Sequence, residues 1–514
     1  MFKLKKIMLM LFILLTLFTT FAFSVKAVSL IPVPDYRTTN GSIKYRNTNI
    51  TVMMPSEYLR KDIGFRAVWV TPVTNDYDAY FKNEQQFKQE MVRILETLEY
   101  YHMNAIIFHI RTFHDAMYNS KINQISKYYA SVNFDEFDPL KWLIDECHKR
   151  GIEFHAWLNP YRVGTYSDLK ALAASYPKTN VASNVDNLLV GSNNDVILDP
   201  GRPEVRSFLI ETVKEIIENY DVDAIHFDDY FYISGANDAK TRELYNTENL
   251  SIGDFRRKQV DLLIEGIHNL LNDYYKKTKK YIQFGISPSG MYRNFGSYVS
   301  PDKYQYDSKG RLTYPLGSNT AGFAHYDNYL YSDTLKWAYE GWIDYLVPQV
   351  YFAFDHDRAP FADIVEWWSM ALKYSKCNLY IGTALYLAGN GSAFGWGSNP
   401  NEMVYQLQFA SQFPEVQGQV IFSYKQLASS LRKGQHYYEN MNRVKKQMWS
   451  KDVILPEVRN AKTKVKLNSV SNLEVTKTSK GYLISFDAIA GAKNYAIYRS
   501  INSLTFSEEE LIKV

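Results

Sequence analysis

The sequence predicts an α/β protein, a (β/α)8 TIM barrel followed by a short β-sandwich-like fragment. Two observations support this prediction. Short apolar segments alternate with amphipathic segments of helical period from residue 65 to residue 423, which is typical of parallel strands joined by right-handed crossover helices. After about residue 450 the pattern changes to a period of two, which indicates strands of an antiparallel sheet.

Eight barrel strands are expected, and eight such units over about 390 residues fit a barrel with long insertions after some strands. The expected strands span 65–70, 105–110, 153–158, 223–228, 283–287, 345–350, 379–385 and 418–423. Helices are expected between them, near 87–101, 139–147, 203–216, 254–275, 332–339, 361–374 and 400–413. Pro139 and Pro203 stand where a first helical turn tolerates proline.

An open, doubly wound sheet is the alternative architecture for the same alternation. That fold usually carries a glycine-rich phosphate-binding turn after its first strand. Here the first expected strand is followed by Thr71, Pro72 and Val73, so the turn is missing and the barrel is favoured.

The first 27 residues have the pattern of an export signal. Three lysines among the first six residues precede an apolar run, 7–23, which is followed by Val25-Lys26-Ala27, the kind of segment that a signal peptidase cleaves. We therefore expect a secreted bacterial protein that starts at Val28 and can associate with the cell surface or cell wall. Because the apolar run is slightly long, an uncleaved membrane anchor is the alternative.

The domain organisation follows from these patterns. We expect a signal peptide at 1–27, an N-terminal extension at 28–62, the barrel at 63–450, a polar linker at 451–470 and a β-rich segment at 471–514. The last segment resembles the opening strands of a fibronectin type III domain, including Tyr495-Ala-Ile-Tyr-Arg499. It has about half the length of such a domain, so it is expected to be a partial copy that serves as a spacer.

Composition narrows the function. A net charge of +3 is close to balance and gives no electrostatic footprint for nucleic acid. Aromatic residues make up 15% of the chain, which suits clefts lined by Tyr and Trp, as in sugar-binding sites. Only Cys147 and Cys377 are present, which excludes a disulfide framework and a cysteine-rich zinc site. No cofactor is expected.

Asp228 and Asp229 are the catalytic candidates, because they end the fourth expected strand and barrel active sites form where strands end. Alternation along the strand places His226 and Asp228 on one face and the apolar Ile225 and Phe227 on the other, so Asp228 should face the pocket. Adjacent carboxylates repel, and we expect one pKa to rise while the other stays low. Such a split supplies an acid and a base at neutral pH.

The structural alternative is that one of these aspartates caps the following loop while the other pairs with Arg111 or Arg162. The other strand ends supply polar and aromatic candidates for binding the substrate or orienting the acids. They are Arg111, Trp157, Asn159, Tyr161, Arg162, His226, Tyr230, Tyr232, Gln349, Tyr351 and Tyr386.

Six motifs occur in order along the expected barrel. They are Phe65-Arg-Ala-Val-Trp-Val70, His155-Ala-Trp-Leu-Asn-Pro-Tyr-Arg162, Leu198-Asp-Pro-Gly201, His226-Phe-Asp-Asp-Tyr-Phe-Tyr232, Gly285-Ile-Ser-Pro-Ser-Gly290 and Pro348-Gln-Val-Tyr351. Together they resemble the bacterial glycosyl-hydrolase-like family 10 over about residues 63–426. The resemblance implies an exported barrel that acts on carbohydrate, such as cell-wall glycan.

The expected mechanism departs from that of a typical glycosidase, which pairs two carboxylates about 5–5.5 Å apart for retention or 6.5–9.5 Å apart for inversion. No Glu stands at an expected strand end, so a second carboxylate would come from Asp229, Asp76, Asp115 or Asp355. If the substrate carries an N-acetyl group, its own carbonyl could attack the anomeric carbon. Asp228 would then be the acid, and Asp229 its orienting partner.

Two other functions fit the sequence. His109, His155 and His226 stand at matching places on three successive expected strands and could hold zinc for a metal-dependent hydrolase, with Asp228 as base. A non-catalytic surface protein would retain glycan without releasing reducing ends. The aromatic residues that could stack on its sugar rings are Trp69, Trp157, Tyr161, Tyr232, Tyr351, Tyr386 and Trp396. A monomer is expected under every hypothesis. For a glycoside hydrolase or a glycan-binding protein, the expected partner is a polysaccharide or cell-wall glycan.

Overall fold

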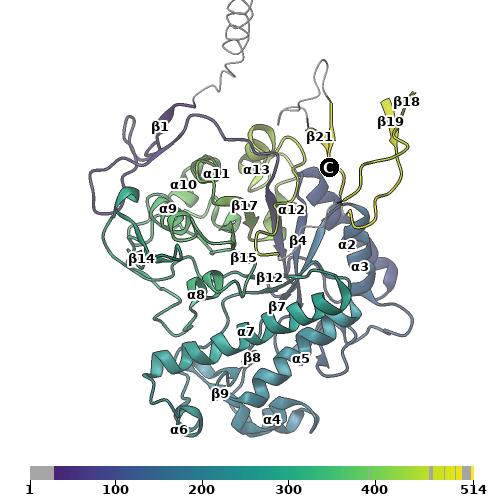
Figure 1. The fold of residues 1–514 in the computed structure, drawn as a ribbon, viewed down its shortest axis with the longest axis vertical. Helices are drawn as coiled ribbons and strands as arrows, with labels where there is room; N and C mark the ends of the chain where they lie inside the picture. Colours follow the sequence, from purple (N-terminus) through teal and green to yellow (C-terminus); the bar gives the residue numbers. More distant parts are fainter. Residues whose placement is uncertain (1–27, 392, 462–466, 480, 493, 500–510) are drawn as a thin grey trace, which may run out of the picture.

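The computed structural model describes residues 28–514 except 392, 462–466, 480, 493 and 500–510. Eight parallel strands close into a barrel in chain order, and helices surround it (Figure 1). The strands are β3 (Phe65–Val70), β4 (Ala105–Arg111), β7 (Glu153–Leu158), β11 (Ala224–Phe227), β12 (Gln283–Ile286), β15 (Tyr345–Leu346), β16 (Asn378–Thr383) and β17 (Val416–Ile421). Each expected barrel strand is present, and the predicted fold class is confirmed.

The helices follow the barrel strands as the crossover rule requires. Those that pack around the barrel are α2 (Glu84–Tyr100), α3 (Pro139–Lys149), α5 (Pro203–Asn219), α7 (Ile252–Thr278), α8 (Thr334–Tyr339), α9 (Phe361–Ala371), α11 (Glu402–Ala410) and α12 (Tyr424–Ser429). Further helices lie in the insertions and after the barrel, namely α4 (Leu169–Ser175), α6 (Ala239–Tyr245), α10 (Gly395–Ser398) and α13 (Tyr438–Gln447).

The insertions carry small antiparallel sheets. The largest follows β7 and has three strands, β8 (Arg162–Thr165), β10 (Asp195–Leu198) and β9 (Leu188–Val190). A two-stranded sheet follows β12, formed by β13 (Gln305–Tyr306) and β14 (Leu312–Tyr314). The short β5 (Asp115–Ala116) and β6 (Gln124–Ile125) pair in parallel after β4. These additions lie on the loops after barrel strands, where a barrel places its active site.

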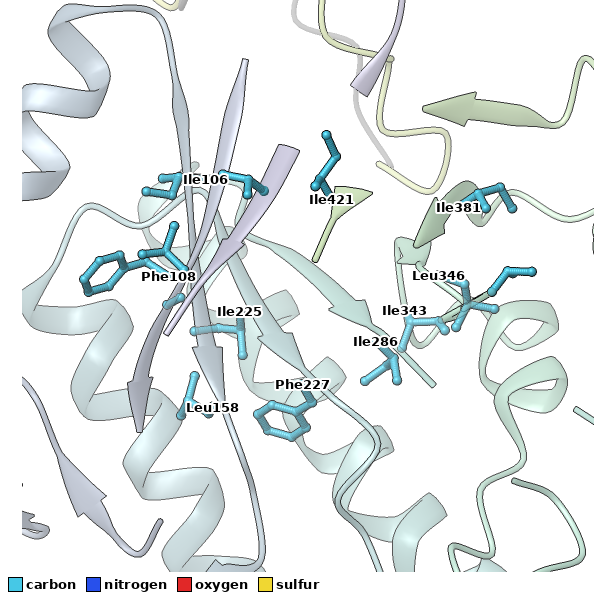
Figure 2. Close-up of a cluster of buried hydrophobic side chains, with 14 of the residues drawn as sticks. Ile106, Phe108, Leu158, Ile225, Phe227, Ile286, Ile343, Leu346, Ile381 and Ile421 are labelled. Carbon is cyan, nitrogen blue, oxygen red and sulfur yellow. The ribbon is translucent and has the colours of Figure 1, made fainter. Parts of the chain in front are cut away.

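The two faces of each barrel strand are buried in different cores. The helix-facing side chains, such as Ile106, Phe108, Ile225 and Phe227, pack against the surrounding helices (Figure 2). The inward side chains fill the barrel with a second cluster rich in aromatic residues: Phe65, Trp69, Trp157, Tyr345 and Tyr380. The alternation expected for the fourth strand is therefore confirmed, since Ile225 and Phe227 face the helices.

At several barrel strands, the side chain of the residue just before the strand accepts a backbone hydrogen bond from the start of a neighbouring strand. The Asn104 side chain accepts a hydrogen bond from the backbone N–H of Arg66 at 2.9 Å. Asp223 and Asp344 do the same for the first turns of their neighbours, accepting from the N–H groups of Phe154 and Phe284 at 2.8 Å. Because these strand-start N–H groups are buried, the side-chain acceptors replace water that cannot reach them.

Residues 451–460 behave differently from the expected free linker. The Ile454 N–H donates to Asp62 O at 2.7 Å, and Ile454 O accepts from the Gly64 N–H at 2.8 Å, which extends the barrel at the base of β3. Arg459 donates to the Asn378 side chain at 2.8 Å. Most side chains of this segment are partly or fully buried, and its backbone is held by the barrel.

The N-terminal extension lies along the flank of the barrel. Its strands β1 (Leu30–Pro32) and β2 (Met53–Pro55) pair in antiparallel register. The Tyr45 hydroxyl donates to Glu366 on α9 at 2.7 Å. Burial beside these groups raises the pKa of Glu366 to about 7. This extension is therefore part of the barrel's packing.

The described part of the C-terminal segment contains two separate two-stranded sheets. One pairs β18 (Glu474–Thr478) with β19 (Gly481–Ser485), and the other pairs β20 (Ile497–Tyr498) with β21 (Leu511–Lys513). Strands were expected in this segment, but the described residues do not form a sandwich. The predicted export signal, 1–27, lies outside the described residues. Within them, we find no helix with the length and apolar character needed to cross a membrane.

Candidate active site

A small pocket opens at the carboxyl ends of the barrel strands, where the sequence predicted the active site. Its volume is about 130 Å³, which is below the range that encloses a whole ligand. It suits one ring-sized group of a larger substrate. Its lining comes from seven of the eight barrel strands and the loops that follow them: Trp69, Thr71, Val73, Thr74, His109, Trp157, Asn159, Arg162, Asp228, Asp229, Tyr230, Ser287, Gln349, Tyr351 and Phe422.

The two candidate carboxyl groups lie together in this pocket, directly after β11. Asp228 is 3% exposed, and burial raises its pKa well above the usual value, with the charge of Asp229 adding to the shift. Burial also raises the pKa of Asp229 to about 6, although Gln349 and the charge of Arg162 act in the opposite direction. The expected split with one low pKa is therefore wrong: both pKa values rise, because both groups are desolvated.

Arg162 lines the pocket and is the cation whose charge acts on both aspartates. Its guanidinium lies 4.8 Å from the ring centroid of Phe113 and 4.5 Å from that of Tyr230. It lowers the pKa of Asp228 and of Asp229 through its charge. Stacking on two rings holds the side chain at the pocket wall, so the fork of N–H donors stands where a substrate oxygen would bind.

Three polar atoms on the pocket wall are buried and form no hydrogen bond of full length and angle. They are the indole Nε1 of Trp157, Oδ1 of Asn159 and Nε2 of His109. The Trp157 indole nevertheless lowers the pKa of Asp228 as a hydrogen-bond donor, and the Asn159 side chain is a hydrogen-bond partner of His109. The His109 and Trp157 rings stack with centroids 3.7 Å apart. The wall beside Asp228 is therefore polar as well as aromatic.

The other candidates for a second carboxylate lie outside the pocket. Asp76 is occupied by four donors, among them the Ser423 hydroxyl at 2.6 Å. Asp115 accepts from the loop that follows β4. Asp355 accepts from Tyr36 of the N-terminal extension at 2.9 Å. Among these four candidates, the structure therefore leaves Asp229 as the one beside Asp228.

Arg111 does not reach the pocket, contrary to expectation. The pairing of β4 with β7 shifts register between His109 and Arg111, so that Arg111 lies opposite Leu158, whose side chain faces the helices. The Arg111 guanidinium is fully buried and donates to the carbonyl oxygens of Asn159 and Pro160 at 2.5 and 3.0 Å. It supports the loop that carries pocket residues instead of contacting substrate.

Three aromatic candidates also lie away from the pocket. Tyr161 and Tyr232 are completely buried in the helix-facing core, so neither can stack on a sugar. Tyr386 is 37% exposed and packs edge-on against Tyr351 and Phe422 with centroids 5.9 and 5.8 Å apart. It therefore stands next to two lining residues without lining the pocket itself.

The three histidines proposed as zinc ligands do not converge. Strand registers put His109 and His226 level with Trp157, while His155 is level with Ile107 one layer below. Trp157 thus lies between the two upper imidazoles. His226 is completely buried under the pocket, where both ring nitrogens form hydrogen bonds. Among the described residues, no three potential ligands cluster closely enough to hold a metal ion.

Several lining residues were not predicted to bind sugar, notably His109 and Ser287. Each occupies an inward position near the end of a strand. Period-two alternation, which predicted the direction of Asp228, predicts both when it is applied to β4 and β12. Phe422 lies in the expected strand 418–423, two positions after the inward Val420, so the same alternation predicts it too.

A closed (β/α)8 barrel with an acidic, aromatic-lined pocket at the carboxyl ends of its strands defines a glycoside-hydrolase-like protein. Comparison with known proteins agrees. A model of the family described as Glycosyl hydrolase-like 10 matches residues 64–394, more than half of the chain. The chain belongs to this family, and the resemblance found in its motifs is confirmed.

Two relatives bear the same class of name. Glycosyl hydrolase YngK of Bacillus subtilis (strain 168) is 36% identical over 380 residues, covering 72% of this chain and 69% of the relative. Glycosyl hydrolase DigH of Escherichia coli (strain K12) is 32% identical over 351 residues, covering 65% and 75%. These identities support the family membership across the barrel.

Solved structures of similar fold share little sequence with this chain. The PgaB (BpsB) glycoside hydrolase domain from Bordetella bronchiseptica is 9% identical with a TM-score of 0.45, covering 75% of this chain and 99% of that one. Alpha-L-fucosidase isoenzyme 2 from Paenibacillus thiaminolyticus is 12% identical with a TM-score of 0.42, and this chain spans half of its length.

Proposed function

We propose that this protein is a secreted glycoside hydrolase that cleaves a glycosidic bond in a polysaccharide, with bacterial cell-wall glycan as the substrate. Asp228 and Asp229 are the catalytic pair. One observation carries the proposal: two carboxyl groups with raised pKa values meet in an aromatic-lined pocket at the carboxyl end of the barrel. Perturbed carboxyl groups in a cleft are typical of glycosidases.

The two aspartates divide the work according to their pKa values. Asp228, whose pKa burial raises well above its usual value, is the acid: it donates its proton to the glycosidic oxygen as the bond from the anomeric carbon to that oxygen breaks. Asp229, with a pKa of about 6, is ionised at neutral pH and stabilises the positive charge that develops on the sugar. Arg162 binds a substrate oxygen beside the pair.

The polar wall beside the acidic pair suits an N-acetylated sugar. An acetamido group offers one carbonyl oxygen and one N–H, and Asp229 would accept a hydrogen bond from that N–H. The carbonyl could then attack the anomeric carbon while Asp229 orients the amide, so that no further carboxylate is needed as nucleophile.

Export is supported by the sequence of residues 1–27. Three early lysines, an apolar run and Val25-Lys26-Ala27 form a signal-peptide pattern. Fractionation of cells that produce the full chain should recover the protein outside the cytoplasm with Val28 at its N-terminus. Recovery of the uncleaved chain in membranes would show an anchor instead.

Turnover of a defined glycan tests the catalytic proposal. The purified protein is incubated with peptidoglycan, with and without peptide stems, and the released fragments are measured by mass and by new reducing ends. Fragments with new reducing ends are expected. Glycan that binds without new ends would show a binding protein and would refute the proposal.

A further inference from the structure

A chain of hydrogen bonds runs through the interior of the barrel, from the floor of the pocket to the opposite rim. The Ser287 hydroxyl, which lines the pocket, lies 2.9 Å from His226 Nε2. His226 Nδ1 lies 3.0 Å from the Tyr345 hydroxyl, which is 2.7 Å from His155 Nδ1. His155 Nε2 ends the chain at Glu153 Oε2, 3.1 Å away. The first four members are 0–1% exposed.

The Glu153 end agrees with one direction along the chain. The side-chain nitrogen of Gln283 donates to Glu153 Oε2 at 3.1 Å, so this oxygen accepts hydrogen bonds, as it would from an N–H at His155 Nε2. In that direction His155 Nδ1 accepts from the Tyr345 hydroxyl, the Tyr345 oxygen accepts from His226 Nδ1, and His226 Nε2 accepts from Ser287.

The pocket end gives the same direction independently. The indole N–H of Trp69 can only donate, and it contacts His226 Nε2 at 3.4 Å. That nitrogen is therefore an acceptor. Burial and the nearby histidines lower the pKa of His226 well below its usual value, so its ring is neutral, as the chain requires.

The Ser287 proton is consequently directed into the barrel. Its other acceptor within reach, the Phe227 carbonyl oxygen at 3.5 Å, also lies among the buried strand atoms. The Ser287 oxygen can therefore present only lone pairs to the pocket. A serine free to rotate its hydroxyl would bind donors and acceptors alike.

We infer that Ser287 binds a hydroxyl group of the sugar as a hydrogen-bond acceptor, and that His226, Tyr345, His155 and Glu153 are positioning residues that hold it in this state. The inference rests on the proposed function and adds a binding contact to that site. Sugar hydroxyl groups donate more strongly as positive charge develops on the ring. Successive hydrogen bonds polarise one another, so the contact strengthens in the transition state.

The direction of the chain is tested first, without any use of activity. Nitrogen-15 NMR of the full chain labelled at histidine reports which ring nitrogen carries the proton, and His226→Gln and His155→Gln variants assign the signals. We expect hydrogen at Nδ1 of His226 and at Nε2 of His155. The opposite tautomer of His226 would turn the Ser287 proton toward the pocket and overturn the inference.

Kinetics with glycan then test the contact. Ser287→Ala and Tyr345→Phe should each lower kcat about tenfold, the size of one hydrogen bond that strengthens in the transition state, with little change in KM. The double variant should lose no more than either single one, because the chain acts as a unit. Tyr380→Phe is the matched control: Tyr380 is also buried inside the barrel, and its hydroxyl contacts Asn378 outside the chain.

The outcomes separate this inference from the proposed function. A wild-type protein with no turnover refutes the proposed function, and with it the contact, while the tautomers still report whether the chain has the stated direction. An active wild type with an unimpaired Ser287→Ala variant refutes the inference alone. Equal rates for Tyr345→Phe and Tyr380→Phe would likewise remove the role of the chain.

Discussion

Asp228 and Asp229 are two ionisable groups that lie side by side in a buried pocket, a position that is unusual for carboxyl groups in a folded protein. Burial raises both pKa values, which means that ionising them in the folded state costs free energy. Such a cost is common where a group must exchange protons near neutral pH. The same burial is the reason why we propose Asp228 as the acid of the pair.

Replacing the acid should remove the proposed activity while leaving the fold intact. Asp228→Asn keeps the shape of the side chain but cannot donate a proton, so kcat should fall by about 10²–10⁴-fold. Asp115→Asn makes the same change at a strand-end acid outside the pocket and should retain the wild-type rate. Release of reducing ends from peptidoglycan measures both, and an unchanged rate for Asp228→Asn would exclude its role as acid.

The pH dependence should report Asp229. Since its pKa is about 6, protonation below that pH removes the negative charge that stabilises the transition state, and kcat/KM should fall as pH drops through 6. Rates from pH 4.5 to 8.5 check this profile. In Asp229→Asn the residual rate should lose the limb near pH 6.

At the scale of elements, short apolar runs predicted the barrel strands, because each strand is buried on both faces. Period-two alternation predicted the inward direction of Asp228. Arg111 was expected in the pocket because it ends its strand, but an irregular register in β4 turns its side chain the other way. The layer of His155 was also not predicted, since the stagger between strands leaves no mark in a single sequence. Tyr161 and Tyr232 follow their strands in the sequence, but loop geometry turns them into the core.

Arg111 should act on the site through the loop after β7. Arg111→Met keeps most of the packing but removes donors to Asn159 and Pro160, leaving buried carbonyl oxygens unpaired. We expect the free energy of unfolding to fall by about 2–4 kcal/mol and kcat/KM to fall as Asn159 is displaced. Arg432→Met, at an exposed position, should change neither. Denaturant unfolding and kinetics measure the two effects, and a stable, fully active Arg111→Met would contradict this role.

At the scale of the whole molecule, the segments that precede and follow the barrel in the sequence both pack against it. The N-terminal extension packs on α9 through Tyr45 and Glu366, and residues 451–460 extend the base of β3. The sequence could not predict the second contact, because backbone hydrogen bonds such as those of Ile454 leave no pattern in a polar segment. The boundaries drawn from composition therefore separate pieces that fold together.

The docking of the N-terminal extension should weaken as pH rises. The pKa of Glu366 is raised from 4.5 to about 7, so its contribution to stability is fully present below about pH 4.5 and is lost as pH rises through 7. Glu366→Gln cannot ionise, and relative to wild type it should gain about 1–3 kcal/mol between pH 5 and pH 8.5. Thermal unfolding at both pH values measures the gain. Glu96→Gln, on the exposed face of α2, should show none.

The C-terminal segment meets the barrel at the end opposite the pocket, where Tyr498 contacts Asp62 at 3.3 Å and Lys513 contacts Asp452 at 2.8 Å. This placement has a geometric consequence for immobilised protein. A molecule tethered to a bead or a wall through its last residues would present its pocket outward, toward incoming polymer. Attachment at the loops after β7 would instead turn the pocket against the support.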